Sequence, residues 1–167
     1  FPYTTLFRSD TSDMDFKEEF VGETFGRINK EEAHLLLKEL EAYILRIGGS
    51  RILEERIDFG LISPYKAQVQ YLRGKIKGSA TLRPYRSLIT VNTVDGFQGQ
   101  ERDVIFISLV RANEEGQIGF LNDLRRMNVA ITRARMKLVI LGEAATLGHH
   151  AFYKQLLEYV KKVNGRQ

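Results

Sequence analysis

The segment Thr90–Arg111 reads TVNTVDGFQGQERDVIFISLVR. Its first residues favour a β-strand, a tight turn follows at Asp95–Gly99, and the apolar run Val104–Val110 comes next. An apolar run of this length indicates a strand that is buried on both faces, which is typical of parallel sheets. The segment therefore predicts two strands of a mainly parallel sheet, joined by a turn that glycine permits.

Helical and extended patterns alternate along the rest of the chain. Asn29 and Glu32 form a variant capping box at the start of one helix, which a glycine pair ends. Ser63 and Pro64 suit the N-cap and the first position of a second helix. The alternation predicts an α/β domain with a mainly parallel sheet flanked by helices. The four expected strands are 57–62, 88–93, 104–110 and 136–141, and the expected helices are 30–47, 64–78, 123–135 and 151–163.

The composition excludes several kinds of protein. None of the 167 residues is cysteine, which rules out a disulfide scaffold, a thiolate zinc site and a cysteine nucleophile. The apolar runs are far shorter than the roughly 20 residues of a membrane span, and no secretory signal is visible. We therefore expect an intracellular, cytoplasmic protein with no membrane partner. Its net charge of +4 is compatible with a phosphate-rich ligand.

The first nine residues, Phe1–Ser9 (FPYTTLFRS), resemble the translation of a sequencing adapter. We expect this segment to be non-native and exclude it from fold reasoning. The alternative is a native strand or loop. If the segment is foreign, the natural protein continues upstream. Residues 10–167 have the length of one domain, since domains commonly hold about 100–150 residues.

Two glycines and a carboxylate mark a candidate ligand site in the Thr90–Arg111 segment. Gly96 and Gly99 allow the backbone to approach a ligand closely, and Glu101 can accept hydrogen bonds from hydroxyls such as those of a ribose. A connector whose glycines serve only the turn is the alternative. The chain has no G-x-x-x-x-G-K-[ST] loop and no strand that ends in an Asp-Glu pair, so it should not hydrolyse ATP alone.

A second segment, Gly119–Arg135, reads GFLNDLRRMNVAITRAR. On a helix that runs to Arg135, Arg126 and Arg133 would share one face. Guanidinium groups on a rigid helix suit phosphate binding, and one of them could act as an arginine finger on another domain. A solvated basic stripe is the simpler alternative. Because ligands of open parallel sheets bind beyond the carboxyl ends of the strands, we expect the polar clusters at that edge.

The two segments, in this order and this close together, resemble motifs V and VI of the superfamily-one helicases, and most of all those of the Upf1-like group. Leu61–Leu72 (LISPYKAQVQYL) resembles the strand-to-helix motif that precedes them in that group. The resemblance covers nearly the whole chain. It implies a RecA-like P-loop NTPase fold without its own P-loop, namely the second RecA-like domain of an ATP-dependent helicase or translocase.

The resemblance also implies a role for each matching residue. Arg133 would contact the γ-phosphate of ATP, and Glu101 would bind its ribose. With Arg126, which is added because of the helical face that it would share with Arg133, the set assigned to the nucleotide comprises Arg133, Glu101, Gly99, Gln98 and Arg126. The set assigned to the nucleic acid or to coupling comprises Ser63, Pro64, Thr93 and Asp95.

The implied cofactor is ATP with Mg²⁺, and a first RecA-like domain of the same polypeptide would hold the magnesium. Single-stranded DNA or RNA is the implied partner, and the isolated fragment is expected to be inactive. The alternative from another class is a non-catalytic RecA-like module that binds nucleic acid or protein; an upstream P-loop would favour the helicase. We expect no metal site in this chain, because His149 and His150 have no third ligand in sight.

Overall fold

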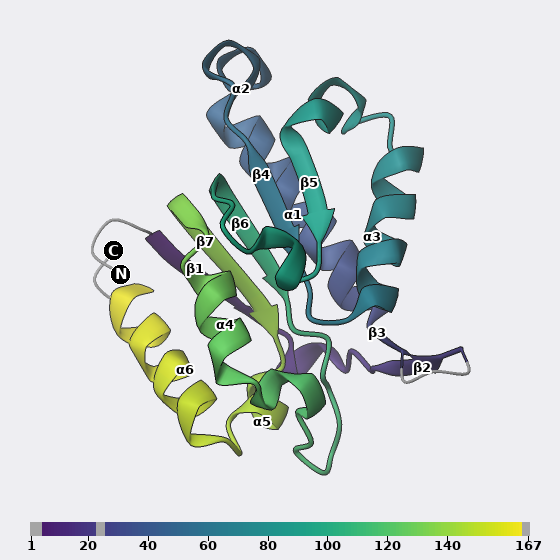
Figure 1. The fold of residues 1–167 in the computed structure, drawn as a ribbon, viewed down its shortest axis with the longest axis vertical. Coiled ribbons are helices and arrows are strands. Elements are labelled where there is room, and N and C mark those ends of the chain that lie inside the picture. The colour runs from purple at the N-terminus through teal and green to yellow at the C-terminus, as the bar shows by residue number, and fades with distance from the viewer. Residues whose placement is uncertain (1–4, 23–25, 165–167) are drawn as a thin grey trace.

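The computed structural model describes residues 5–22 and 26–164 of the chain. Its centre is a five-stranded sheet in the order β1-β7-β6-β4-β5, and every pairing in this sheet is parallel (Figure 1). A two-stranded antiparallel hairpin, β2–β3, projects from the domain. The strands are β1 (Thr5–Asp10), β2 (Glu19–Val21), β3 (Gly26–Ile28), β4 (Phe59–Ile62), β5 (Ile89–Asn92), β6 (Arg102–Ser108) and β7 (Ala134–Gly142).

Helices cover both faces of the sheet, as the sequence predicts. Alternate residues of β6 enter opposite cores, with Val104 and Phe106 in one and Ile105 and Ile107 in the other, and all four are buried. The first core holds side chains of α1 (Lys30–Ile47), α2 (Gly49–Glu55) and α3 (Lys66–Gly78). The second core holds side chains of α4 (Leu124–Ile131), α5 (Ala144–Leu147) and α6 (Ala151–Asn164).

Short 3₁₀ helices fill several of the connections: η1 (Ser12–Met14), η2 (Arg83–Leu88), η3 (Asp95–Phe97) and η4 (Gly119–Asn122). Residues 5–10 form β1 at one edge of the sheet, although the sequence analysis set most of this segment aside. Residues 1–4 lie outside the described part of the chain. The non-native origin of Phe1–Ser9 stays a prediction. In the parts of the chain that the structure describes, no helix has both the length and the apolar character of a membrane span.

The two predicted helix starts fare differently. Asn29 caps α1 as expected, because its Oδ1 accepts from the backbone N–H of Glu32 at 3.0 Å. The Glu32 side chain, however, does not reach back to the cap but enters the protein interior. The second helix begins at Lys66 and not at Pro64. Sheet pairing explains the difference, since the backbone N–H of Ser63 donates to Asn92 O at 3.4 Å and holds Ser63 extended.

The predicted helix over 123–135 is too long by four residues. It ends at Ile131, where Thr132 is the C-cap, and Ala134 already belongs to β7. The Arg133 carbonyl accepts from the backbone N–H of Arg102 at 3.0 Å, so pairing with β6 draws the chain out of the helix. The expectation that Arg126 and Arg133 share a helical face is therefore wrong.

Candidate functional site

The residues that the sequence analysis selected lie at two opposite edges of the sheet. All five strands run in the same direction, so their carboxyl ends meet at one edge. Ser63 and Thr93 directly follow β4 and β5 and lie at this carboxyl edge. Glu101 and Arg133 directly precede β6 and β7 and lie at the amino edge. The carboxyl-edge expectation is therefore wrong for Glu101 and Arg133.

At the amino edge, sheet pairing brings Glu101 and Arg133 onto neighbouring strand entrances. Arg102 is in register with Ala134, and the backbone N–H of Arg102 donates to Arg133 O. The half-buried Arg133 guanidinium is anchored by Nε to Val129 O at 3.1 Å and by Nη2 to Thr132 Oγ1 at 3.1 Å. No carboxylate among the described residues pairs with it. Its remaining N–H groups can bind an anion.

The turn before β6 leaves room for a ligand next to Glu101. Gly99 has a φ of +75°, which favours glycine, and no atom lies within 4 Å of the position of a Cβ there. Gln98 and Glu101 are exposed, with carboxylate oxygens of Glu101 available as acceptors. Arg102 stiffens the turn, because its guanidinium carbon lies 5.5 Å from the centroid of the Phe97 ring, within the range of a cation–π interaction.

At the carboxyl edge lies a cleft of about 600 Å³. Pro64, Thr93 and Asp95 line it, whereas Ser63 is buried beneath it. Arg126 also lines this cleft and pairs with Asp95 Oδ2 through Nη2 at 3.3 Å. Arg126 therefore lies with the nucleic-acid set and not beside Glu101 and Arg133. The other lining residues are Val21, Gly26, Tyr65, Lys66, Ala67, Val94 and Phe120.

Two segments connect the cleft with the amino edge, and both pack on the same face of the sheet. The chain from Thr93 to Glu101 passes through η3, and α4 leads from Arg126 towards Arg133. Phe97 of the first segment and Met127 of the second belong to one buried core. The Asp95–Arg126 ion pair joins their cleft ends. The two segments are therefore in contact with each other both through this core and at the cleft.

An exposed aromatic ring stands between this cleft and a second one. Phe120 is 53% exposed, and its ring lies 5.3 Å from that of Tyr65 at an angle of 30°. Phe120 and Tyr65 also line the neighbouring cleft of about 280 Å³, together with Phe20 and Arg27. Tyr65 itself is buried, with 3% exposed, and supports Phe120 from behind. No sequence pattern singled out Phe120, whose exposure depends on the η4 turn that carries it.

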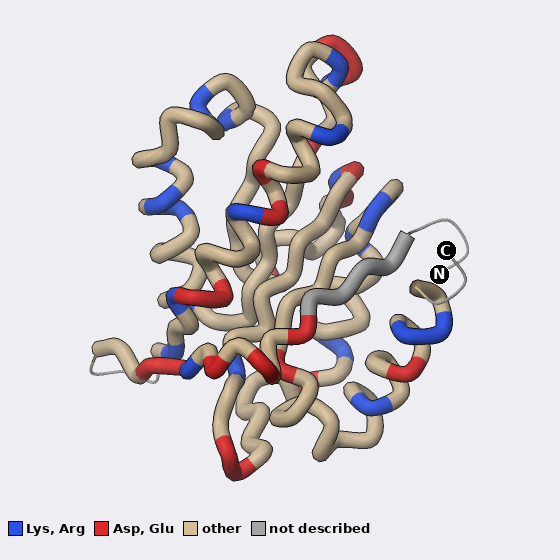
Figure 2. Tube along the Cα trace, turned by 180° about the vertical axis from the view of Figure 1, so that it is seen from behind, with Lys and Arg blue, Asp and Glu red and all other residues tan. Residues whose placement is uncertain are grey.

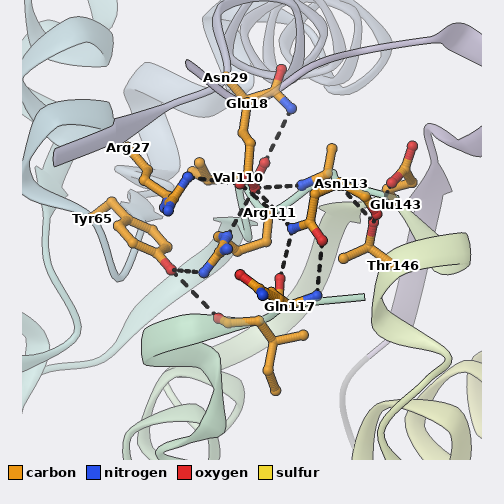
Figure 3. Close-up of polar contacts among 12 residues, drawn as sticks. Glu18, Arg27, Asn29, Tyr65, Val110, Arg111, Asn113, Gln117, Glu143 and Thr146 are labelled. Carbon is orange, nitrogen blue, oxygen red and sulfur yellow. Dashed lines mark hydrogen bonds and ion pairs between the residues drawn. The ribbon is translucent and has the colours of Figure 1, made fainter. Parts of the chain in front are cut away.

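A buried ion pair fixes the hairpin to the end of β6 (Figure 3). Arg111 Nε donates to Glu18 Oε2 at 2.8 Å, and Arg27 of the hairpin donates to Glu18 Oε1 at 2.9 Å. Arg111 Nη1 also donates to the Tyr65 hydroxyl at 3.3 Å. Burial lowers the pKa of Arg111, but the hydrogen bonds to Glu18 and Tyr65 outweigh it and raise the pKa above its ordinary value. The guanidinium therefore stays charged.

A second buried polar cluster holds the backbone that follows β6. Val110 has a φ of +70°, an uncommon conformation for a β-branched residue. Its N–H donates to Glu32 Oε1 at 2.8 Å, and its carbonyl accepts from Asn29 Nδ2 at 3.1 Å. Ser108 Oγ donates to the same Glu32 oxygen at 2.6 Å, while Glu32 Oε2 has no hydrogen-bond partner among the described residues. Burial raises the pKa of Glu32 to about 7.

A parallel sheet with helices on both faces is the architecture of a RecA-like α/β domain. The chain belongs to the AAA_12 family, whose sequence profile, described as "AAA domain", matches residues 4–145. This match and the relatives below confirm the resemblance to the second RecA-like domain of the Upf1-like superfamily-one helicases.

Three relatives show the extent of the similarity. The probable helicase MAGATAMA 3 of Arabidopsis thaliana is 38% identical over 86% of this chain, the regulator of nonsense transcripts 1 homolog of Drosophila melanogaster is 38% identical over 87%, and the helicase SEN1 of Saccharomyces cerevisiae is 37% identical over 87%. The chain spans 17%, 12% and 6% of the lengths of these proteins, respectively. It thus corresponds to one part of much longer proteins.

Proposed function

We propose that residues 10–167 act as the second motor domain of an intracellular, ATP-dependent nucleic-acid helicase, with ATP bound between this domain and a first RecA-like domain. One observation carries the proposal: an exposed carboxylate and an arginine without a carboxylate partner among the described residues lie on neighbouring strand entrances of a RecA-like domain that has no P-loop. Such a domain has groups for the outer parts of a nucleotide but nothing to cradle its phosphates.

In this proposal, Arg133 is the arginine finger of the shared ATP site. Its Nε and Nη2 are held by the end of α4, so little side-chain freedom is lost when the other N–H groups meet the γ-phosphate. Arg133 then stabilises the charge that develops during phosphoryl transfer. Glu101 accepts from the ribose hydroxyls, and the open backbone at Gln98 and Gly99 leaves space for the nucleotide. The bound magnesium, held by the first domain, would neutralise phosphate charge.

The cleft at the carboxyl edge is the proposed binding face for single-stranded DNA or RNA. Lys66 supplies positive charge, and Arg126 supplies further N–H donors although its charge is balanced by Asp95 and Asp123. The exposed Phe120 ring supplies a surface on which a base can stack. Pro64 and Thr93 line the path of the strand, and the buried Ser63 shapes the turn beneath it. These features combine cations with an aromatic ring, as sequence-tolerant single-strand sites do.

The two connecting segments supply a route for coupling between the proposed sites. A strand that enters the cleft meets Asp95 and Arg126, whose ion pair joins the starts of both segments. Their other ends carry Glu101 and Arg133. Binding of the strand can therefore change how these two groups meet ATP, and hydrolysis can change the grip on the strand.

The test compares ATP hydrolysis by this chain with hydrolysis by the longer polypeptide of which we propose it is a part. We expect activity that single-stranded nucleic acid stimulates in the longer polypeptide only. Hydrolysis by the chain alone would contradict the split site. No hydrolysis by either, combined with intact nucleic-acid binding, would favour a non-catalytic RecA-like binding module.

A further inference from the structure

The charge of the chain is concentrated in one segment. Residues 59–94 contain six lysines and arginines and no aspartate or glutamate, whereas the other 131 residues carry 19 basic and 21 acidic side chains. The segment covers β4, α3, η2 and β5, and blue marks α3 and η2 in Figure 2. All six basic side chains are exposed: Lys66, Arg73, Lys75, Lys77, Arg83 and Arg86.

Three of these cations form a row along α3. Lys66, Arg73 and Lys77 are seven and four residues apart, so they project from one side of the helix. At about 1.5 Å per residue, the row is about 16 Å long. It begins in the cleft at the carboxyl edge, which Lys66 lines, and leads away from it. We call Lys66, Arg73, Lys77 and the neighbouring Arg86 the basic row.

The far end of the basic row lines a separate cleft of about 350 Å³. Arg73, Lys77 and Arg86 supply its cations, and Thr90 and Val91 of the edge strand form one wall. Arg73 is fixed in place, because Nε and Nη2 both donate to Val91 O, at 3.0 and 2.7 Å. Arg86 Nη2 donates to Lys77 O. The two guanidinium groups are thus positioned before any ligand arrives, and each has further N–H donors available.

No acidic group neutralises the row within the described part of the chain. Over residues 5–22 and 26–164, none of its four cations forms an ion pair, although arginines elsewhere in the domain do. Exposed cations of one sign without acidic neighbours create a positive potential that attracts polyanions. Arg73 and Arg86 donate to backbone carbonyl oxygens, which leave the charge of each guanidinium intact.

We infer that the basic row is a second nucleic-acid contact, which binds the phosphate backbone of the strand beyond the single-strand cleft. This inference rests on the proposed function, because the row begins at Lys66 in the cleft assigned to the strand. Three properties favour a nucleic acid over an acidic protein: continuity with that cleft, regular spacing along a line, and arginines that can bind phosphate with two N–H groups. The contact carries no base preference, since phosphates are common to all sequences.

The test measures how salt affects binding of a fluorescent single-stranded 20-mer to this chain. The row variant Arg73→Gln, Lys77→Gln, Arg86→Gln removes three charges. The matched control Lys154→Gln, Lys161→Gln, Lys162→Gln removes three exposed charges from α6. Loss of three phosphate contacts should reduce the slope of log K against log salt by about 2, and weaken binding at 100 mM NaCl about tenfold or more. In the control variant, the salt slope and the affinity at 100 mM NaCl should each change by no more than about a third of the change expected in the row variant.

Several outcomes would overturn the inference. One is a slope in the row variant equal to that of the control, with both variants folded as judged by circular dichroism. Another is failure of the unaltered chain to bind the 20-mer at 50 mM NaCl. If the chain bound polyglutamate of the same charge as tightly as the 20-mer, the basic row would be assigned to binding of acidic proteins. The cleft variant Arg126→Gln separates the two proposals: weaker binding with Arg126→Gln but not with the row variant would reject the row alone.

Discussion

Replacing Glu32 by Gln should remove most of the pH dependence of stability between pH 4.5 and 8. Glu32 is fully buried, and only one of its carboxylate oxygens has hydrogen-bond donors among the described residues. Burial disfavours the charged form and raises its pKa to about 7, against an ordinary value of 4.5. The side chain packs between the start of α1 and the end of β6, so its protonation is linked to folding.

The direction in which stability changes with pH follows from the number of protons bound in the folded and unfolded states. The unfolded chain releases the Glu32 proton near pH 4.5, whereas the folded chain retains it until about pH 7. Between these values the folded state binds more protons, so stability decreases as the pH rises. The stabilising contribution of protonated Glu32 is fully present below about pH 4.5 and is lost as the pH rises through about 7. At about 1.36 kcal/mol per pKa unit, the change is about 3 kcal/mol.

Urea unfolding of this chain at pH 4.5, 6, 7 and 8 measures the effect. In the Glu32→Gln variant, the amide oxygen can still accept from Ser108 and Val110, but the amide does not titrate. Between pH 4.5 and 8, the decrease in the free energy of unfolding should therefore be about 3 kcal/mol smaller in the variant than in the unaltered chain. Glu158→Gln, at an exposed position on α6, serves as the control and should follow the unaltered chain. Parallel pH profiles of the unaltered chain and Glu32→Gln would refute the reasoning.

Two further substitutions test the buried ion pair and the exposed ring. Arg111→Ala leaves the buried Glu18 carboxylate with Arg27 as its remaining charged partner, so urea unfolding should show a loss of about 3 kcal/mol, the lower end for a broken buried pair. A loss below about 1 kcal/mol would contradict the role given to the pair. Phe120→Ala should weaken single-strand binding by about 1–3 kcal/mol, measured by fluorescence anisotropy, because a stacking surface is lost. Leu45→Ala, an exposed apolar residue on α1, is the matched control, and equal effects of the two substitutions would reject stacking on Phe120.

The strands of the main sheet were predictable except for β1. Each predicted strand overlaps one of β4 to β7, because a strand buried on both faces leaves an apolar run in the sequence. Helix ends were less predictable, since they depend on distant partners. The helical sequence pattern continues to Arg135, but the Arg133 carbonyl accepts a hydrogen bond from the backbone N–H of Arg102, and this strand pairing ends the helix earlier. Only the register of the strands shows which residues that are far apart in the sequence become neighbours in space.

The site was predictable in part for the same reason. The residues at both edges of the sheet were selected from the sequence, but all of their roles except that of Arg126 came from resemblance and not from spacing. The Glu18–Arg111 pair joins residues 93 apart, and no local pattern announces such a contact. Arg126 was assigned to the nucleotide from an assumed helical face shared with Arg133, which the end of α4 at Ile131 excludes.

The central claim, that Arg133 completes an ATP site shared with a first RecA-like domain, is tested most directly by Arg133→Ala in the longer polypeptide. Turnover of ATP under single-strand stimulation should fall by about 10³ or more, while the Kd for ATP changes far less. Arg51→Ala, an exposed arginine paired with Glu55 of its own helix, should leave turnover unchanged. Turnover in Arg133→Ala equal to that of the unaltered enzyme would contradict the account.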